Sequence, residues 1–306
     1  MRRPSGRAQA TSLFLVSLCL GLPAPALGQA WLPPQGEGSV TITYQQLFSR
    51  DHLDWKGDPF DRGSVTSHSL LTGVEYGISD RLAIDVKVAL VANRHQGVDS
   101  LHGPLDTGEY HGTIQDARVT LAMQVPTRGA LAIAPFVGGV LPTHAYETRG
   151  HSAPGRRLRA LQLGTWVGRD LGPWVPDAYV QGQYSFAFVE RIGDMSINRS
   201  VADLEVGYTV SSLLTVTVAG TVHHTHGGLE FPLPRDEHFD EVFPFHDRVA
   251  RDNFFLMSAG VTVAIRRNMA AFGTVIRTVT GQNTHRVTGF TAGVSWLFGR
   301  GLTLGG

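Results

Sequence analysis

The sequence is poor in charge and nearly free of cysteine. Charged residues make up 17% of its 306 residues, the formal net charge is +0, and Cys19 is the only cysteine. Soluble domains average about 25% charged residues, so an ordinary soluble surface is disfavoured. Equal numbers of basic and acidic residues also give no overall field that would attract nucleic acid. We therefore expect no nucleic-acid partner.

Long hydrophobic runs are missing as well. The mean hydropathy is -0.03, whereas each membrane-spanning helix needs about 20 consecutive apolar residues. The apolar run 13–22 is too short to span a bilayer, but it follows three arginines and precedes small residues, as in a secretory signal peptide. We expect residues 1–28 to be this signal peptide, with cleavage after Gly28 or Ala30, and residues 29–306 to form a single domain.

Cleavage also removes Cys19. An exported chain without cysteine has no disulfides, no cysteine-bound zinc and no cysteine nucleophile. The sequence further lacks a Gly-x-Ser-x-Gly elbow, a phosphate-binding glycine loop, a His-Glu-x-x-His motif and a dinucleotide-binding glycine signature. We therefore predict no catalytic residues and no cofactor.

What the sequence does contain is strict alternation of apolar and polar residues. In the segment 82–90, Leu82, Val86 and Leu90 share one parity, while Asp85 and Lys87 share the other. A period of two is the pattern of a β-strand, and helical periodicity is absent. Twelve segments follow it: 39–48, 65–77, 81–91, 113–125, 130–141, 157–169, 177–190, 196–210, 213–225, 253–265, 269–280 and 284–298.

The connections between these segments alternate in length. Short links lie at 78–81, 126–129, 211–212 and 266–268, and longer loops lie at 49–64, 92–112, 142–156 and 226–252. Short turns at one end and long loops at the other are typical of outer-membrane barrels. A soluble sandwich would alternate in the same way, but its wet face would carry Lys and Glu, whereas the polar parity here is mostly Gly, Thr, Ser and Gln.

We therefore predict an all-β protein, a transmembrane antiparallel up-and-down β-barrel of twelve strands in the cell outer membrane. Its aliphatic parity would face lipid and its polar parity a hydrated lumen, because a closed sheet alone lets strands pair every backbone group in lipid. An even strand number places both termini in the periplasm. No large plug domain is expected, since the first strand begins close to the cleavage site.

The last predicted strand ends in aromatic residues. Phe290, Trp296 and Phe298 share a parity, and the first and last of them lie about 26 Å apart along a strand. With a strand tilt this is roughly 20 Å along the membrane normal, so these residues would mark the two edges of the apolar band. A terminal strand ending in Phe resembles the signal read by the barrel-assembly machinery, which we expect as a partner beside the lipid bilayer.

The first third of the barrel resembles a known family. The residues that carry the likeness are the start 31–38, Tyr44, His52-Leu53-Asp54, Ser67-His68-Ser69-Leu70 and the run 73–83 with its Glu-Tyr-Gly-Ile-Ser-Asp-Arg-Leu turn. They resemble the outer-membrane barrels grouped as the meta-pathway phenol-degradation family of transporters. The resemblance covers residues 31–90 and implies uptake of small aromatic or hydrophobic compounds. Within the turn, Gly77 tolerates a positive φ and Ser79-Asp80 can bond back to the backbone.

Charged residues on the lumen parity are the candidate solute-pathway residues. They are Glu75, Asp85, Lys87, Asp116, Arg118, Asp203, Glu205 and Arg286, with Arg277 as a further candidate. Inward charges of both signs can orient a polar solute. They can equally pair across the lumen and fix its shape, so both interpretations stay open.

Histidines gather beside the longest loop. His224 and His226 share a strand face, and the following loop holds Asp236, Glu237, His238, Asp240, Glu241, His246 and Asp247. Two imidazoles with a loop carboxylate would suit a divalent metal ion. The alternative, which we favour, is a polar loop that covers the barrel mouth without binding metal.

The sequence thus favours an outer-membrane channel or uptake transporter that passes small, aromatic or hydrophobic molecules by passive diffusion through a polar lumen. Two other classes are kept as alternatives. In the first, the extracellular loops bind a partner or a metal ion, because loops carry function more often than their scaffold. In the second, the barrel is a lipid-modifying enzyme. The oligomeric state is open, since a subunit contact would look like any other lipid-facing stripe.

Overall fold

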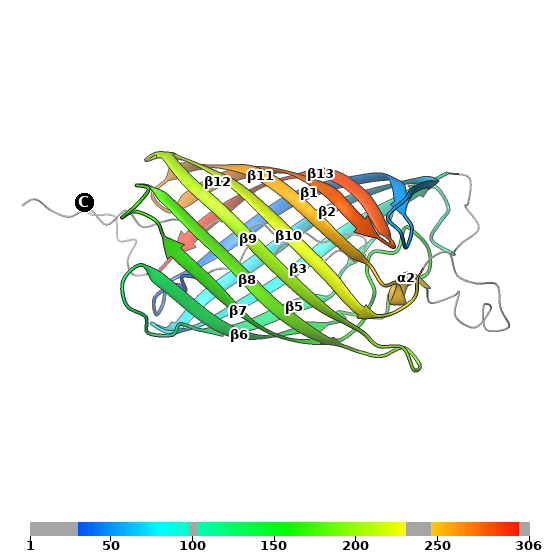
Figure 1. Cartoon of the computed structure of the whole chain (residues 1–306), viewed down its shortest axis with the longest axis horizontal. Coiled ribbons are helices and arrows are strands. Elements are labelled where there is room, and N and C mark those ends of the chain that lie inside the picture. The colour runs from blue at the N-terminus through cyan, green and yellow to red at the C-terminus, as the bar shows by residue number, and fades with distance from the viewer. Residues whose placement is uncertain (1–29, 98–102, 231–245, 300–306) are drawn as a thin grey trace, which may run out of the picture.

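The computed structural model describes residues 30–97, 103–230 and 246–299 (Figure 1). The predicted signal peptide lies outside these residues, and so do the loop residues Asp236, Glu237, His238, Asp240 and Glu241. The side chains of His246 and Asp247 are also outside the described part.

The described residues form thirteen strands in one sheet. They are β1 (Gly38–Leu53), β2 (Pro59–Ser79), β3 (Leu82–Gln96), β4 (His111–Ile114), β5 (Ala117–Met123), β6 (Leu131–Leu141), β7 (Ala160–Asp170), β8 (Ala178–Val189), β9 (Ile197–Ser211), β10 (Leu214–Gly227), β11 (Asn253–Arg266), β12 (Met269–Gln282) and β13 (Thr284–Phe298). The single-turn helix α2 (His246–Val249) precedes β11. None of the described helices has the length and apolar character needed to cross a membrane.

The sheet closes on itself into a barrel of tilted strands (Figure 1). Neighbouring strands pair antiparallel, and β1 pairs with both β2 and β13, with Gly38 opposite Phe298 and Leu53 opposite Thr284. β4 and β5 pair with successive parts of β3, so they share one position in the wall. The barrel therefore has twelve strand positions, and the predicted fold class is confirmed.

The predicted strand 113–125 is interrupted between β4 and β5. Gln115 Nε2 donates a hydrogen bond to the Pro154 carbonyl at 2.6 Å, and Asp116 accepts one from the Tyr146 hydroxyl at 2.7 Å. Both side chains therefore bind the loop between β6 and β7, and the strand resumes at Ala117.

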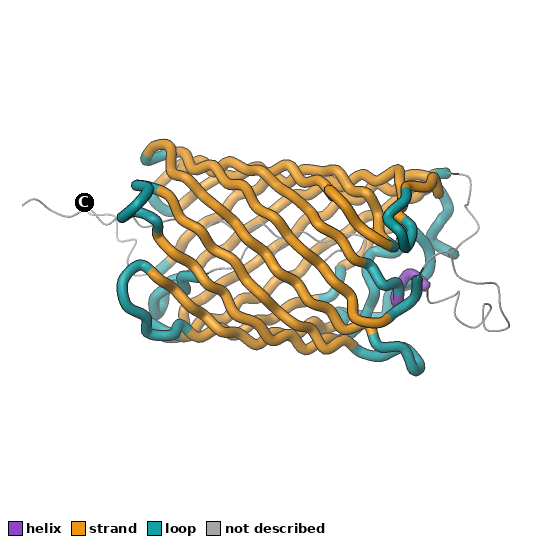
Figure 2. Tube along the Cα trace, in the orientation of Figure 1, coloured by secondary structure: helices purple, strands orange, loops and turns teal. Residues whose placement is uncertain are grey.

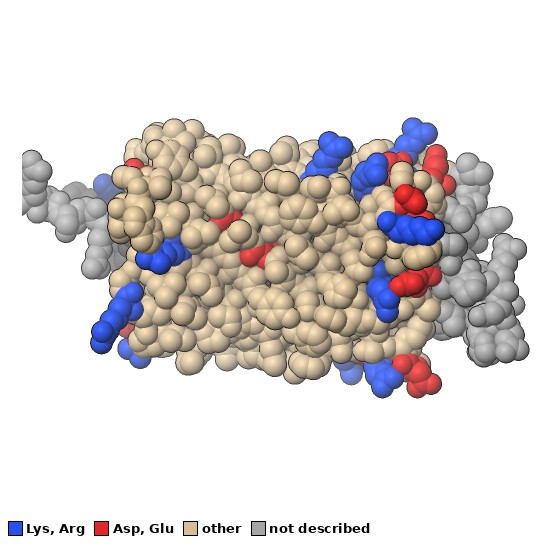
Figure 3. Space-filling view, viewed as in Figure 1, with Lys and Arg blue, Asp and Glu red and all other residues tan. Residues whose placement is uncertain are grey.

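The two faces of the wall differ in the way that the alternation predicts. On β1, Thr43 and Gln45 are at most 1% exposed, whereas Ile42 and Phe48 are each 45% exposed. On the face in view, the outer surface between the two ends is nearly free of charge apart from two small acidic patches, and Lys and Arg gather toward the ends (Figure 3). An apolar band around a polar interior is the arrangement of a barrel surrounded by lipid.

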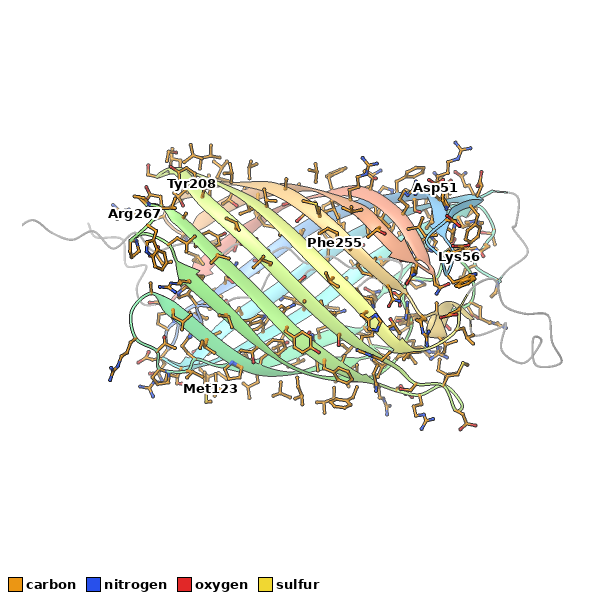
Figure 4. All side chains as sticks on the ribbon, in the orientation of Figure 1. Asp51, Lys56, Met123, Tyr208, Phe255 and Arg267 are labelled. Atoms are coloured by element: carbon orange, nitrogen blue, oxygen red, sulfur yellow. The ribbon has the colours of Figure 1, made fainter. Side chains whose placement is uncertain are left out.

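The connections gather at the two ends of the barrel (Figure 2). Tyr208 and Arg267 lie at one end, here called the short-turn end, where β1 begins and β13 ends (Figure 4). Asp51 and Lys56 lie at the other, here called the long-loop end (Figure 4). Met123 points outward into the apolar band, with 54% of its surface exposed (Figure 4).

The predicted long loop 49–64 is wrong. β1 continues to Leu53 and β2 begins at Pro59, which leaves a tight connection of residues 54–58. Asp54 Oδ1 accepts hydrogen bonds from the Lys56 and Asp58 backbone N–H groups, and Gly57 supplies the left-handed conformation at φ 88°. An Asx turn with a glycine thus lets both strands extend beyond the apolar band.

A short N-terminal segment, residues 30–37, crosses the lumen at the short-turn end. Ala30 is fully buried among alanines of β5 and β6 and the Trp166 ring of β7. Trp31 packs edge-on against Tyr179 of β8, with ring centroids 6.3 Å apart. The segment then reaches the opposite wall and pairs with β2, so it partly fills this end of the barrel.

Gly77 on β2 receives this segment and does not adopt a positive φ. Gly36 N–H donates to the Gly77 carbonyl at 2.9 Å, and Gly77 N–H donates to the Glu37 carbonyl at 2.8 Å. A Cβ at Gly77 would lie 2.1 Å from the Pro34 carbonyl oxygen. Glycine is therefore required here by close backbone approach, while Asp80 Oδ1 accepts a hydrogen bond from the Gln35 N–H at 3.1 Å.

Candidate functional site

The first group of predicted pathway residues lies on β2 and β3, toward the short-turn end of the lumen. Lys87 Nζ lies 2.9 Å from Asp85 Oδ1, and Glu75 stands opposite Asp85 in the strand register. Glu75 is 5% exposed and Asp85 is 9% exposed. These three side chains line a small pocket together with hydroxyl groups of β1, so one cation lies beside two carboxyl groups on this wall.

The second group, Asp203 and Glu205, lies on β9 on the other side of the barrel. Asp203 accepts hydrogen bonds from Gln183 and Thr221, both at 2.5 Å. Glu205 accepts from the Tyr179 hydroxyl and from Gln181, both at 2.8 Å. All four donors are neutral, so these bonds orient the carboxyl groups without cancelling their charge.

Asp116 and Arg118 join the first wall to a cluster of arginines. Arg118 on β5 interacts electrostatically with Asp116 and with Asp85. Arg199 on β9 interacts with Arg118, Arg156 and Asp252, and its Nε and Nη2 atoms have no hydrogen-bond partner. Arg199 therefore lies within electrostatic range of both other arginines, and the three are here called the arginine cluster (Arg118, Arg156 and Arg199).

Arg286 and Arg277 stand apart from the other candidates. Val287 on β13 is fully buried, so Arg286 beside it has the outward parity, and it pairs with Asp51 at 3.2 Å at the long-loop end. Arg277 is exposed on the parity of Val275, which is 62% exposed. Both assignments to the lumen face are corrected, because the alternation within β12 and β13 places Arg277 with Val275 and Arg286 with Phe290 on the exposed outer face.

The connection between β6 and β7, residues 142–159, is here called the mouth loop. On one side Asn93 Nδ2 of β3 donates to the Ala153 carbonyl at 2.8 Å. On the other side the Arg156 guanidinium lies 2.9 Å from the Asp252 carboxylate, next to β11. Because β3 and β11 are separated by several strands in either direction around the wall, the mouth loop spans the lumen at the long-loop end.

The Arg156–Asp252 contact fixes the mouth loop firmly. Asp252 also accepts a hydrogen bond from the Thr225 hydroxyl of β10 at 2.8 Å. Burial raises the pKa of the Asp252 carboxyl, but Arg156 and His223 more than offset this effect and hold the pKa well below its usual range. The carboxylate is therefore charged at neutral pH, and the ion pair forms.

The lumen is less uniformly polar than the alternation predicts. Inward-facing apolar side chains of β1 to β3 and β11 to β13 form one buried cluster, here called the apolar wall: Leu47, Leu71, Ala89, Val91, Phe254, Leu256, Ile276 and Val287. In sequence these residues interrupt the polar parity of their strands one or two at a time. Only the closed register brings them together.

The histidine pair predicted as a metal site faces outward. His224 and His226 do share a strand face, with ring centroids 4.6 Å apart, but both are exposed on the outer surface of β10. His226 Nε2 bonds to the Ser200 hydroxyl at 2.8 Å. The loop carboxylates proposed as further ligands lie outside the described residues.

Among solved structures, this barrel is similar in fold to an outer membrane channel. The COG4313 outer membrane channel from Pseudomonas putida F1 aligns over 89% of this chain and 98% of its own, at 12% identity and a TM-score of 0.66. The fold is that of a known outer-membrane channel. The KdgM porin and the NanC porin align less closely, each at 10% identity and a TM-score of 0.47, over 84% and 85% of this chain and 99% and 98% of their own. No family model matches the chain, and no curated protein matches its sequence.

The sequence reasoning missed Arg199 and the mouth loop. Arg199 shares the parity of Asp203 and Glu205, so parity alone could have identified it. Arg156 and Asp252 lie between predicted strands, in segments without periodicity. Nothing in the sequence indicates that these two segments meet across the barrel.

Proposed function

We propose that the protein is an outer-membrane channel through which small molecules diffuse passively. The observation that carries the proposal is a closed barrel with an apolar outer band and a lumen lined by charged and hydrogen-bonding side chains. Such a wall supports passage of solutes that bind weakly and at several places.

The lumen chemistry favours solutes that combine an apolar body with a carboxylate. The apolar wall offers hydrocarbon contact along β11 to β13 and β1 to β3. The arginine cluster offers guanidinium groups, and two nitrogens of Arg199 and two of Arg156 lack a hydrogen-bond partner. Guanidinium groups bind carboxylates in a bidentate fork, so small aromatic acids match both features. The resemblance to the phenol-degradation transporters, which implies aromatic or hydrophobic cargo, favours the same class of solute.

Liposome swelling tests the proposal. Proteoliposomes would be challenged with isosmotic benzoate, a neutral sugar and an amino acid, and the rate of swelling measured by light scattering. We expect entry of benzoate to exceed entry of the sugar. A barrel impermeable to all three solutes would overturn the channel function, whereas equal rates would overturn the solute class alone.

An Arg199→Gln variant sharpens the solute assignment. It keeps hydrogen-bonding capacity on β9 while it removes one guanidinium from the arginine cluster. Benzoate entry should fall relative to sugar entry. Arg267→Gln, at the short-turn end outside the lumen (Figure 4), is the matched control and should leave the ratio unchanged.

We further propose that the short-turn end faces the periplasm, with the leader removed after Gly28 or Ala30. Barrels of this class have short periplasmic turns and longer extracellular loops. Cysteine introduced by Asp194→Cys, between β8 and β9, should react on intact cells with a membrane-impermeant maleimide. Cysteine introduced by Asn268→Cys, between β11 and β12, should react only after the outer membrane is opened. The reverse pattern would overturn the orientation.

The last part of the proposal concerns assembly of the barrel in the outer membrane and its action without catalysis. We infer that the terminal strand β13, which ends at Phe298, engages the barrel-assembly machinery, and that the barrel acts without a catalytic step. Phe298→Ala should lower the amount of folded barrel in the outer membrane. The mass of lipid A should stay the same when the protein is expressed, and a change in that mass would favour the enzyme alternative.

A further inference from the structure

Three histidines from distant parts of the chain meet at the long-loop end. His52 lies near the end of β1, His285 near the start of β13, and His151 in the mouth loop. One potential ligand nitrogen from each ring lies within 4.8 Å of the other two. The mouth loop starts about half the circumference away from β13, so this meeting depends on the loop crossing the lumen.

The two strand histidines are placed by the closing register of the barrel. His52 stands opposite His285 in the β1–β13 pairing, and their ring centroids are 4.0 Å apart. Side chains directly opposite on neighbouring antiparallel strands are close enough to share a ligand. Two of the three candidate ligands are therefore built into wall strands.

His151 is brought to this pair by a carboxylate that holds its backbone. Asp106 accepts hydrogen bonds from the N–H groups of His151 and Ser152, both at 2.9 Å. The His151 ring then lies 5.1 Å from the His52 ring and 6.3 Å from the His285 ring, between centroids. The loop is thus anchored at the backbone of its own candidate ligand and of the next residue.

We propose that His52, His151 and His285 bind one divalent transition-metal ion of the zinc class. Imidazole is a preferred ligand of zinc, nickel and copper ions, whereas calcium and magnesium need oxygen ligands. Zinc–nitrogen bonds of about 2.0–2.1 Å place tetrahedral ligands roughly 3.3 Å apart, so each ring needs to move on the order of 1 Å. Three protein ligands leave a fourth position for water or for a passing solute.

The bound ion would tie the mouth loop to the β1–β13 wall. Arg156 and Asn93 already hold the loop at other points, and the ion adds a contact on the third side of the mouth. Metal ions join segments that are far apart in sequence, and their binding energy stabilises the closed arrangement. The ion would therefore narrow the long-loop end.

Calorimetric titration of the purified, folded barrel in detergent tests the site. Zinc chloride should bind with one ion per barrel, and magnesium chloride should give no binding heat. His52→Ala and His285→Ala should each weaken zinc binding at least as much as the roughly 10–100-fold that loss of an outer-shell partner costs. Both lie on wall strands, and the resistance of the folded barrel to unfolding in SDS checks that each variant still folds.

The matched control is the double variant His224→Ala/His226→Ala, which removes the exposed histidine pair of β10. It should bind zinc as tightly as the wild type. Absence of zinc binding by the wild type, or loss of binding in this control with retention in His285→Ala, would overturn the site. Because binding is measured in detergent, the result is independent of the proposed channel function, which fails or stands on the swelling assay.

Discussion

The side chains next to a charged lumen residue determine whether its charge acts on a solute or only stabilises the wall. Asp85 has Lys87 at 2.9 Å, so much of its field is cancelled locally. Asp203 and Glu205 instead accept hydrogen bonds from neutral groups, and these bonds place no opposite charge beside the two carboxyl groups. For the alternatives left open by the sequence, we therefore propose that the β3 pair braces the wall and that the β9 pair is the candidate selectivity element.

The double variant Asp203→Asn/Glu205→Gln tests the β9 pair. Both replacements keep oxygen acceptors for Gln183 and Tyr179, so the barrel should still fold. The preference for cations over anions should fall, because two uncompensated carboxyl groups are removed from the wall. The reversal potential in planar bilayers under a potassium chloride gradient measures this change.

The control removes the same number of carboxyl groups outside the lumen. Asp170 is the exposed last residue of β7 and Asp177 lies exposed just before β8, and Asn suits the left-handed φ of 64° at Asp177. Asp170→Asn/Asp177→Asn should keep the wild-type reversal potential. Equal shifts in both double variants would mean that net charge, and not the β9 wall, sets selectivity.

Asp252 allows a prediction about pH. Its pKa in the folded barrel is below the ordinary value of 3.8 because Arg156 and His223 outweigh the effect of burial. A depressed pKa means that the Arg156 contact contributes fully above about pH 4 and is lost only when the pH falls through the lowered value. This ion pair should therefore hold the mouth loop unchanged between pH 7 and pH 5.

Asp252→Asn removes the charge at neutral pH and keeps an acceptor for Thr225. We expect the mouth loop to loosen, at a cost in unfolding free energy of about 1–3 kcal/mol. Single-channel recordings should show higher or more variable conductance than the wild type at pH 7. Asp194→Asn, in the exposed connection between β8 and β9 at the same end, should leave the recordings unchanged.

At the scale of elements, the wall was predictable and the segments inside it were not. All twelve predicted strands are present within a few residues, because lipid on one side and water on the other impose a period of two on every strand. The tight turn after Leu53 and the break at Gln115 escaped prediction, since each depends on hydrogen bonds with a particular local partner.

The site was predicted only where it follows parity. Glu75, Asp85, Lys87, Arg118, Asp203 and Glu205 face the lumen, as alternation predicts. Arg277 and Arg286 share the outward parity of Val275 and Phe290, so the alternation, followed strictly, places them outside the lumen. Contacts of the mouth loop join segments about 90 residues apart across an enclosed space, as between Arg248 and Arg156, and no periodic pattern encodes them.

Shortening the mouth loop tests its place across the lumen. Replacing residues 147–155 with a short Gly-Ser linker removes the contacts with Asn93 and Gln115 while β6 and β7 keep their ladder. Conductance should rise, because chain is removed from the cross-section at the long-loop end. The same replacement of residues 190–195 between β8 and β9 should not change conductance, and a rise there would mean that any shortened loop opens the barrel.

In the whole molecule, the lumen is narrowed at both of its ends, so a solute would meet two restrictions in series. The mouth loop crosses the long-loop end, and residues 30–37 cross the short-turn end, where Trp31 and Leu32 pack against the cluster around Trp166. Resistances in series add, so removing the smaller one changes the total little while the larger one remains. The two ends should therefore show non-additive effects on conductance.

The double variant Trp31→Ala/Leu32→Ala, alone and combined with the shortened mouth loop, tests this arrangement. It truncates the side chains in the lumen and leaves the backbone bonds of Gly36 and Glu37 to Gly77, so β1 should keep its register. The increase in single-channel conductance for the combined variant should exceed the sum of the two separate increases. If the increases simply add, the two segments border separate paths, and if the N-terminal variant changes nothing in either background, residues 30–37 lie beside the path and not across it.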